Sequence, residues 1–125
     1  MAGERILIVD DNATNLKLVA YLMQAYGYVV DTALDAESAI EAIRQRHPDV
    51  ILMDIQLPGI DGLELTRRLK ADPATRDIVI IAVTAYAMKS DQAKALAAGC
   101  NDYITKPIDT RVLPETIARH LAKKD

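Results

Sequence analysis

Apolar residues along this chain gather in short continuous runs separated by longer, amphipathic segments. Three runs are continuous over four to six residues, at positions 6–9, 50–53 and 78–83. Short runs rich in Ile and Val are typical of strands that are buried on both faces of a parallel sheet. Two shorter runs, at 28–30 and 103–104, predict edge strands.

Between these strands, apolar residues recur every three or four positions, which predicts helices. The segments with this spacing are 16–23, 39–43, 63–69, the alanine-rich 88–98, and 113–121. Asp35 can cap the start of the second, and Gly27 and Gly99 can end the first and fourth. The alternation predicts an α/β fold: a doubly wound, five-stranded parallel sheet in the order 2-1-3-4-5, with five helices on its two faces.

Length and charge narrow the class of protein. A chain of 125 residues fits one domain, 1–125, and its net charge of −3 argues against a nucleic-acid partner. A single cysteine, Cys100, excludes an internal disulfide and favours a cytoplasmic location; we expect it to be a small core residue. We expect no membrane partner, because no apolar run approaches the roughly 20 residues of a spanning helix.

Polar residues stand where the predicted central strands end. Asp10 and Asp11 follow the first strand, Asp54 the third and Thr84 the fourth, and Lys106 lies just after the fifth. In an open parallel sheet, ligands bind outside the carboxyl ends of the strands, where the strand order reverses. In the order 2-1-3-4-5 this point lies between the first and third strands, so the three aspartates should converge.

Converging carboxylates repel each other and need a cation. Oxygen ligands without His or Cys indicate Mg²⁺ or Mn²⁺ rather than zinc. With the metal and Lys106 neutralising a phosphoryl group, Asp54 could attack phosphorus as a nucleophile, and the Thr84 hydroxyl could hydrogen-bond a phosphoryl oxygen.

Each of these residues also has a simpler interpretation. Asp10 and Asp11 could cap the next helix, Asp54 could be a turn residue, Thr84 could merely end a strand, and Lys106 could lie in an ordinary loop. The combination of all of them is more specific than any member. His47 and His120 have no partner in the pattern, so neither is assigned a catalytic role.

Two other functions remain open at this point. An aspartyl-phosphate phosphatase usually has a second Asp two residues after the nucleophile, where this chain has Gln56. A flavin-binding module of flavodoxin type would need a Ser-, Thr- or Gly-rich loop after the first strand, where this chain has Asp10, Asp11 and Asn12.

The sequence resembles the CheY-like receiver domain of bacterial response regulators, from about Arg5 to about Leu121. It is similar to single-domain regulators and to receiver modules of hybrid histidine kinases. The segments that carry the resemblance are 6–12 (ILIVDDN), 52–62 (LMDIQLPGIDG), 82–85 (AVTA) and 102–107 (DYITKP).

The resemblance implies a phospho-acceptor in two-component signalling or a phosphorelay. Asp54 would accept a phosphoryl group from a histidine kinase or histidine phosphotransfer protein. Mg²⁺ would be held by Asp10, Asp11, Asp54 and the backbone carbonyl of Gln56. Such a protein is a switch rather than an enzyme, although it assists its own phosphorylation and dephosphorylation.

The resemblance also implies how the signal leaves the site. Thr84 and Lys106 would bind the phosphoryl group, the bond before Pro107 would be cis, and Tyr103 would turn inward when Thr84 moves. The surface of the fourth helix, fifth strand and fifth helix would then bind a downstream protein. We expect a monomer, or a dimer through that surface, without a DNA-binding output domain.

Overall fold

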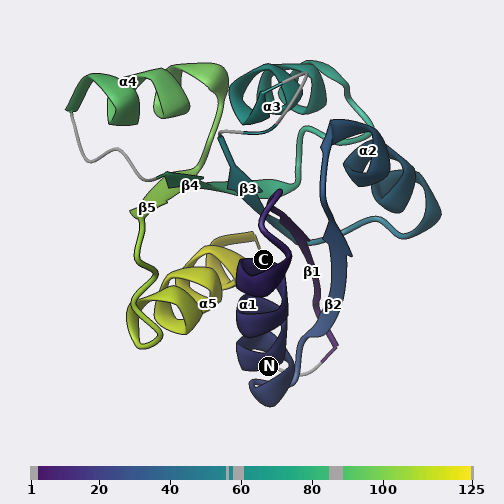
Figure 1. Cartoon of the computed structure of the whole chain (residues 1–125). Coiled ribbons are helices and arrows are strands. Elements are labelled where there is room, and N and C mark those ends of the chain that lie inside the picture. Colours follow the sequence, from purple (N-terminus) through teal and green to yellow (C-terminus); the bar gives the residue numbers. More distant parts are fainter. Residues whose placement is uncertain (1–2, 56, 58–60, 85–88, 125) are drawn as a thin grey trace.

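The computed structural model describes residues 3–55, 57, 61–84 and 89–124 (Figure 1). Within these ranges the chain alternates five strands with five helices. The elements are β1 Arg5–Val9, α1 Ala13–Ala25, β2 Val29–Ala33, α2 Ala36–Gln45, β3 Val50–Asp54, α3 Gly62–Ala71, β4 Val79–Thr84, α4 Lys89–Ala98, β5 Asp102–Thr105 and α5 Val112–Lys124.

The described strands form one parallel sheet in the order β2-β1-β3-β4-β5, which confirms the predicted fold class. Met53 of β3 lies opposite Val9 of β1 and Ala82 of β4, and Asp54 lies opposite Val83. Strands β1, β3 and β4 therefore end at nearly the same level. This common edge is where the candidate site lies.

Alternate residues of the strands pack against two different helical layers, because successive side chains point to opposite faces of a sheet. Leu7, Ile51 and Ile80 contribute to the core under α2, α3 and α4. Ile6, Leu52 and Ile81 contribute to the core under α1 and α5. Figure 1 shows these two helical layers on either side of the sheet. Among the described residues, no helix has the length and hydropathy needed to cross a membrane.

The outer strands are longer than the apolar runs predict. The run at 28–30 predicts an edge strand, but β2 occupies Val29–Ala33, and Tyr28 lies buried just before it. Asp31 and Thr32 pair with β1 although they are polar. An edge strand can keep polar side chains in water, so hydrophobicity alone underestimates its length. Likewise β5 extends beyond 103–104, and Met88 of the predicted fourth helix lies outside the described residues.

Cys100, which follows α4, is 6% exposed and belongs to the core under α2–α4, as predicted. Its Sγ lies 3.9 Å from the hydroxyl oxygen of Thr66, which donates to the carbonyl oxygen of Gly62 at 2.7 Å. Burial raises the pKa of the Cys100 thiol, against smaller opposite effects of Thr66 and Lys70. The thiol is therefore a packing group that links α4 to α3.

Candidate functional site

Three carboxylates converge at the carboxyl edge of the sheet, as the strand order predicted. One oxygen each from Asp10, Asp11 and Asp54 lies within 4.8 Å of the others. Asp54 is 2% exposed and Asp10 is 6% exposed, whereas Asp11 is open to solvent. Two buried carboxylates and one accessible carboxylate thus face a single point.

Local hydrogen bonds turn Asp10 toward this point. Its Oδ1 accepts from the backbone N–H of Asn12 at 2.9 Å, and its Oδ2 accepts from the Asn15 side-chain amide at 3.3 Å. Asn12, and not the acidic pair, caps α1, because its Oδ1 accepts from the N–H of Asn15 at 3.1 Å. Asp10 and Asp11 are therefore available for the site rather than committed to the helix end.

Asp54 is the last residue of β3, and the chain around it is held closely. The N–H of Ile55 donates to the carbonyl oxygen of Val83 at 3.2 Å, and the N–H of Gly62 donates to that of Ile55 at 3.3 Å. A Cβ at Gly62 would lie 2.4 Å from the carbonyl oxygen of Asp54. Only glycine lets α3 begin this close to the backbone of β3.

Lys106 brings a positive charge to two of the carboxylates. Its Nζ lies 3.1 Å from Oδ2 of Asp54 and 3.7 Å from Oδ2 of Asp10. The backbone N–H of Lys106 donates to the carbonyl oxygen of Thr84 at 2.7 Å, and its peptide bond to Pro107 is cis, as the resemblance implied. One cation facing three carboxylates leaves the cluster negatively charged.

Thr84 and Tyr103 lie on the neighbouring strands β4 and β5. Thr84 ends β4 one position beyond the partner of Asp54, and it is 1% exposed. Tyr103, on β5, lies opposite Ala82 of β4 and is partly buried against the core under α2–α4. Thr84 pairs in register with Thr105, two positions after Tyr103. Gln56, the remaining predicted ligand, lies outside the described residues.

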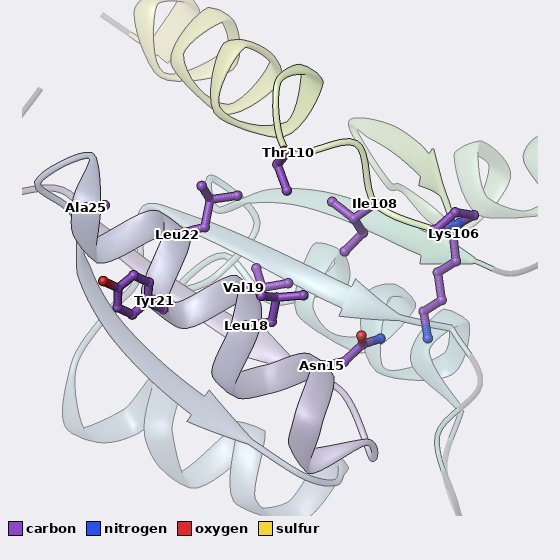
Figure 2. Close-up of a pocket in the computed structure, with 10 residues that line it drawn as sticks. Asn15, Leu18, Val19, Tyr21, Leu22, Ala25, Lys106, Ile108 and Thr110 are labelled. Carbon is purple, nitrogen blue, oxygen red and sulfur yellow. The ribbon is translucent and has the colours of Figure 1, made fainter.

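A groove begins at the cluster and runs along α1. It has a volume of about 590 Å³ and lies between α1 and the segment 106–110 (Figure 2). Asn15, in the first turn of α1, and Lys106 line the groove and also contact Asp10 and Asp54, respectively. Leu18, which also lines it, is 62% exposed. The groove is thus an apolar surface continuous with the carboxylate site.

The sequence did not predict a pair that joins β5 to α5. His120 Nε2 donates to Oδ2 of Asp102 at 2.9 Å, and Arg119 lies 3.5 Å from the same oxygen. Burial raises the pKa of Asp102, but hydrogen bonds from His120 and the Tyr103 N–H, with the nearby positive charges, bring it below its ordinary value. No sequence motif marks this pair, because it depends on how α5 packs against β5.

The architecture and the polar edge described above match one protein family. The sequence fits the model of the response regulator receiver domain over residues 6–118. The chain therefore belongs to the response regulator receiver domain family, whose members are switches in two-component signalling.

Particular relatives agree with this class. The chain is 46% identical over 116 residues to the polar-differentiation response regulator DivK of Brucella ovis, covering 93% of this chain and 94% of that one. It is similar to the crystal structure of a CheY-like receiver domain protein from Methanospirillum hungatei JF-1, with TM-score 0.90, 32% identity, and coverage of 98% and 97% of the two chains.

A third relative is the receiver domain of a sensor histidine kinase from Pseudomonas aeruginosa PAO1. Its crystal structure superimposes with TM-score 0.85 and 36% identity, covering 94% of this chain and 97% of that one. In that protein a magnesium ion is coordinated in the active site cleft.

Proposed function

We propose that this chain is a phospho-acceptor switch that takes a phosphoryl group onto Asp54 from a phosphohistidine of a kinase or phosphotransfer protein. The observation that carries the proposal is the convergence of Asp10, Asp11 and Asp54 with Lys106 Nζ 3.1 Å from Asp54. We take residues 1–125 as one domain. The cytoplasmic location stays a prediction.

The donor set fits a hard divalent cation. Three carboxylate oxygens within 4.8 Å of one another match the oxygen ligands that Mg²⁺ prefers, and the exposed Asp11 leaves that side open to water, which Mg²⁺ usually retains. Asp10, Asp11 and Asp54 would hold the ion, and the carbonyl of Gln56 is proposed as a further ligand. When bound, Mg²⁺ neutralises charge on the phosphoryl oxygens.

The chain's own residues would carry the transfer as follows. A carboxylate oxygen of Asp54 attacks phosphorus, the bond from phosphorus to the donor's imidazole nitrogen breaks, and an acyl phosphate forms on Asp54. The ammonium group of Lys106, which already lies 3.1 Å from this carboxylate, then pairs with a phosphoryl oxygen. The buried hydroxyl of Thr84 donates to another oxygen, which is supported by its position beside Asp54 at the strand edge.

The groove along α1 is the docking surface that we propose for the phosphodonor, with a helix of that donor as the occupant. Two observations support this choice. The groove is continuous with the acceptor site through Asn15 and Lys106. The exposed Leu18 and Tyr21 belong to a helix whose charged residues are limited to Lys17, so an apolar helix face could cover it without burying unpaired charges.

The output surface would be the face formed by α4, β5 and α5. A second groove there is lined by residues that include Tyr103, Asp102 and Arg119. On α4, Leu96 is 50% exposed. Movement of Thr84 toward the phosphoryl group would let Tyr103 turn inward and reshape this face. A downstream protein, or a second copy of the chain, would then bind one state better than the other.

The two rival functions are less well supported. The position two residues after Asp54 is Gln56, which cannot act as the general acid of a phosphatase. Asp10 and Asp11 place negative charge where a flavin phosphate would bind. We also propose that the domain assists its own dephosphorylation, with stoichiometric labelling rather than turnover of phosphate esters.

Labelling with acetyl phosphate in millimolar Mg²⁺ tests the proposal. We expect close to one phosphoryl group per chain in the unmodified protein and none in Asp54→Asn. Asp77→Asn, a matched change at an exposed carboxylate, should label normally. Persistent labelling of Asp54→Asn would place the acceptor elsewhere, and sustained turnover of a phosphate ester would favour the phosphatase.

A further inference from the structure

Lys70 makes a set of contacts at the edge of the sheet opposite the phospho-acceptor. It lies in the last turn of α3, and its Nζ donates to the carbonyl oxygens of Ile78 at 2.6 Å and Arg76 at 3.1 Å, and to Oδ1 of Asn101 at 3.0 Å. An ammonium group carries three protons, so it can serve these three acceptors at once. One side chain thus joins α3, the start of β4 and the start of β5.

Asn101 carries this connection into the sheet. Its Oδ1 also accepts from the N–H of Ile80 at 2.9 Å, and its own N–H donates to the carbonyl oxygen of Ile80 at 2.7 Å. These bonds continue the pairing of β4 and β5 by one residue before β5 begins. Lys70 therefore holds the residue that sets where β5 starts.

The end of α4 rests on the stem of the same lysine. Gly99 has a φ of +110°, and a Cβ there would lie 2.8 Å from Cγ of Lys70. Among the α4 side chains that the structure describes, from position 92 onward, the buried ones are Ala95 and Ala98. Helix α4 is consequently fixed at its carboxyl end by backbone contact and small side chains.

The opposite end of α4 follows Thr84 in the chain. Five residue steps of β4 separate Val79 from Thr84, roughly 16 Å at the rise of a parallel strand. The contacts of Lys70 are therefore remote from the phosphoryl chemistry. A shift that begins at Thr84 would reach the amino end of α4 first and the lysine contacts last.

We propose that Lys70 is a positioning residue that anchors the carboxyl end of α4 and the start of β5, so that α4 pivots about residues 99–101 when Asp54 is phosphorylated. The anchor is a property of the unphosphorylated fold. The pivot rests on the function proposed above.

The anchor is tested by residue-resolved amide hydrogen exchange without phosphorylation. Lys70→Met keeps an unbranched stem under Gly99 and removes the ammonium; Arg67→Met is the control, on the same helix but paired with Glu64 at the surface. We expect Lys70→Met to speed exchange of the Gly99 and Asn101 amides about tenfold, the effect of a lost charge-assisted hydrogen bond, and to leave β1 and β3 unchanged. The control should change none of these amides.

Two results would overturn the anchor. One is exchange in Lys70→Met that accelerates equally in β1 and β3, because this would show a general loss of stability. The other is unaltered exchange at Gly99 and Asn101. Asn101→Ala removes the same bond from its other end, and it should speed exchange of Gly99 even if Lys70→Met folds poorly.

The pivot is tested by repeating the measurement with Mg²⁺ and acetyl phosphate. In the unmodified protein, we expect exchange to change at the amino end of α4 and to stay constant at 99–101; in Lys70→Met the change should extend to 99–101. An equal change at both ends of α4 in the unmodified protein would refute the pivot. Absence of labelling would instead count against Asp54 as acceptor, and the first measurement would still decide the anchor.

Discussion

The clustered carboxylates predict that Mg²⁺ stabilises the fold and that Asp11 is needed for this effect. Two unit charges 4.8 Å apart repel by about 0.9 kcal/mol in water and about 3.5 kcal/mol at an effective dielectric near 20. Asp11 is exposed, so its repulsion from each neighbour lies toward the lower value. Asp11→Asn removes the repulsion from both neighbours and should therefore leave the metal-free protein equally stable or more stable by up to about 2 kcal/mol.

In the unmodified protein, bound Mg²⁺ raises the free energy of unfolding. At about one hundred times the dissociation constant, a ligand that binds the native state alone adds about 2.7 kcal/mol. For a domain of this size, 1 kcal/mol shifts the melting temperature by about 4 °C, so the expected rise is about 10 °C. Asp11→Asn should lose most of this rise, because one of three carboxylate ligands is gone.

Thermal unfolding followed by circular dichroism, with and without Mg²⁺, measures both quantities. Asp77→Asn serves as the control, since this exposed carboxylate lies beside His47 and should not change the metal response. A full Mg²⁺ shift in Asp11→Asn would exclude Asp11 as a ligand. No shift in the unmodified protein in millimolar Mg²⁺ would refute the metal site altogether.

Two other expectations concern the surfaces around the site. Leu18→Glu should slow phosphoryl transfer from a phosphohistidine protein at least about tenfold, which is the loss expected for one buried apolar anchor. It should not affect labelling by acetyl phosphate, and the control Leu96→Glu should change neither reaction. If Leu18→Glu and the unmodified protein accept phosphate from the protein donor at equal rates, the α1 groove is excluded as the docking surface. Carbon NMR of Asp102 should give a titration midpoint below the ordinary value of about 3.9, and His120→Ala should raise it. Because folding lowers the pKa of Asp102, its carboxylate stabilises the fold at pH values above the ordinary pKa, and this stabilisation is lost as the pH falls through the lowered pKa. A titration midpoint at or above the ordinary pKa would contradict the contacts of Asp102.

The sequence predicts the carboxylate cluster well because parallel strands align their carboxyl ends. Asp10, Asp11 and Asp54 each follow or end an apolar run, so their convergence needs only the strand order. The position of Lys106 follows from the same reasoning, since it comes directly after β5.

Contacts made by helices were not predictable in the same way. The amide of Asn15 reaches Asp10 because α1 presents that side toward the site, and His120 reaches Asp102 because of the rotation of α5. The network of Lys70 depends on two loops whose paths no periodicity describes. Each of these contacts is set by packing between elements, which a local pattern does not contain.

The burial of Cys100 makes the molecule convenient for site-specific spectroscopy. A thiol that is 6% exposed, with a pKa raised by its apolar surroundings, is a poor nucleophile toward maleimides. A second cysteine introduced at the exposed position of Leu96 would therefore react selectively without removal of the native one. A fluorophore or spin label attached there would report the displacement of α4 directly in the otherwise unaltered chain.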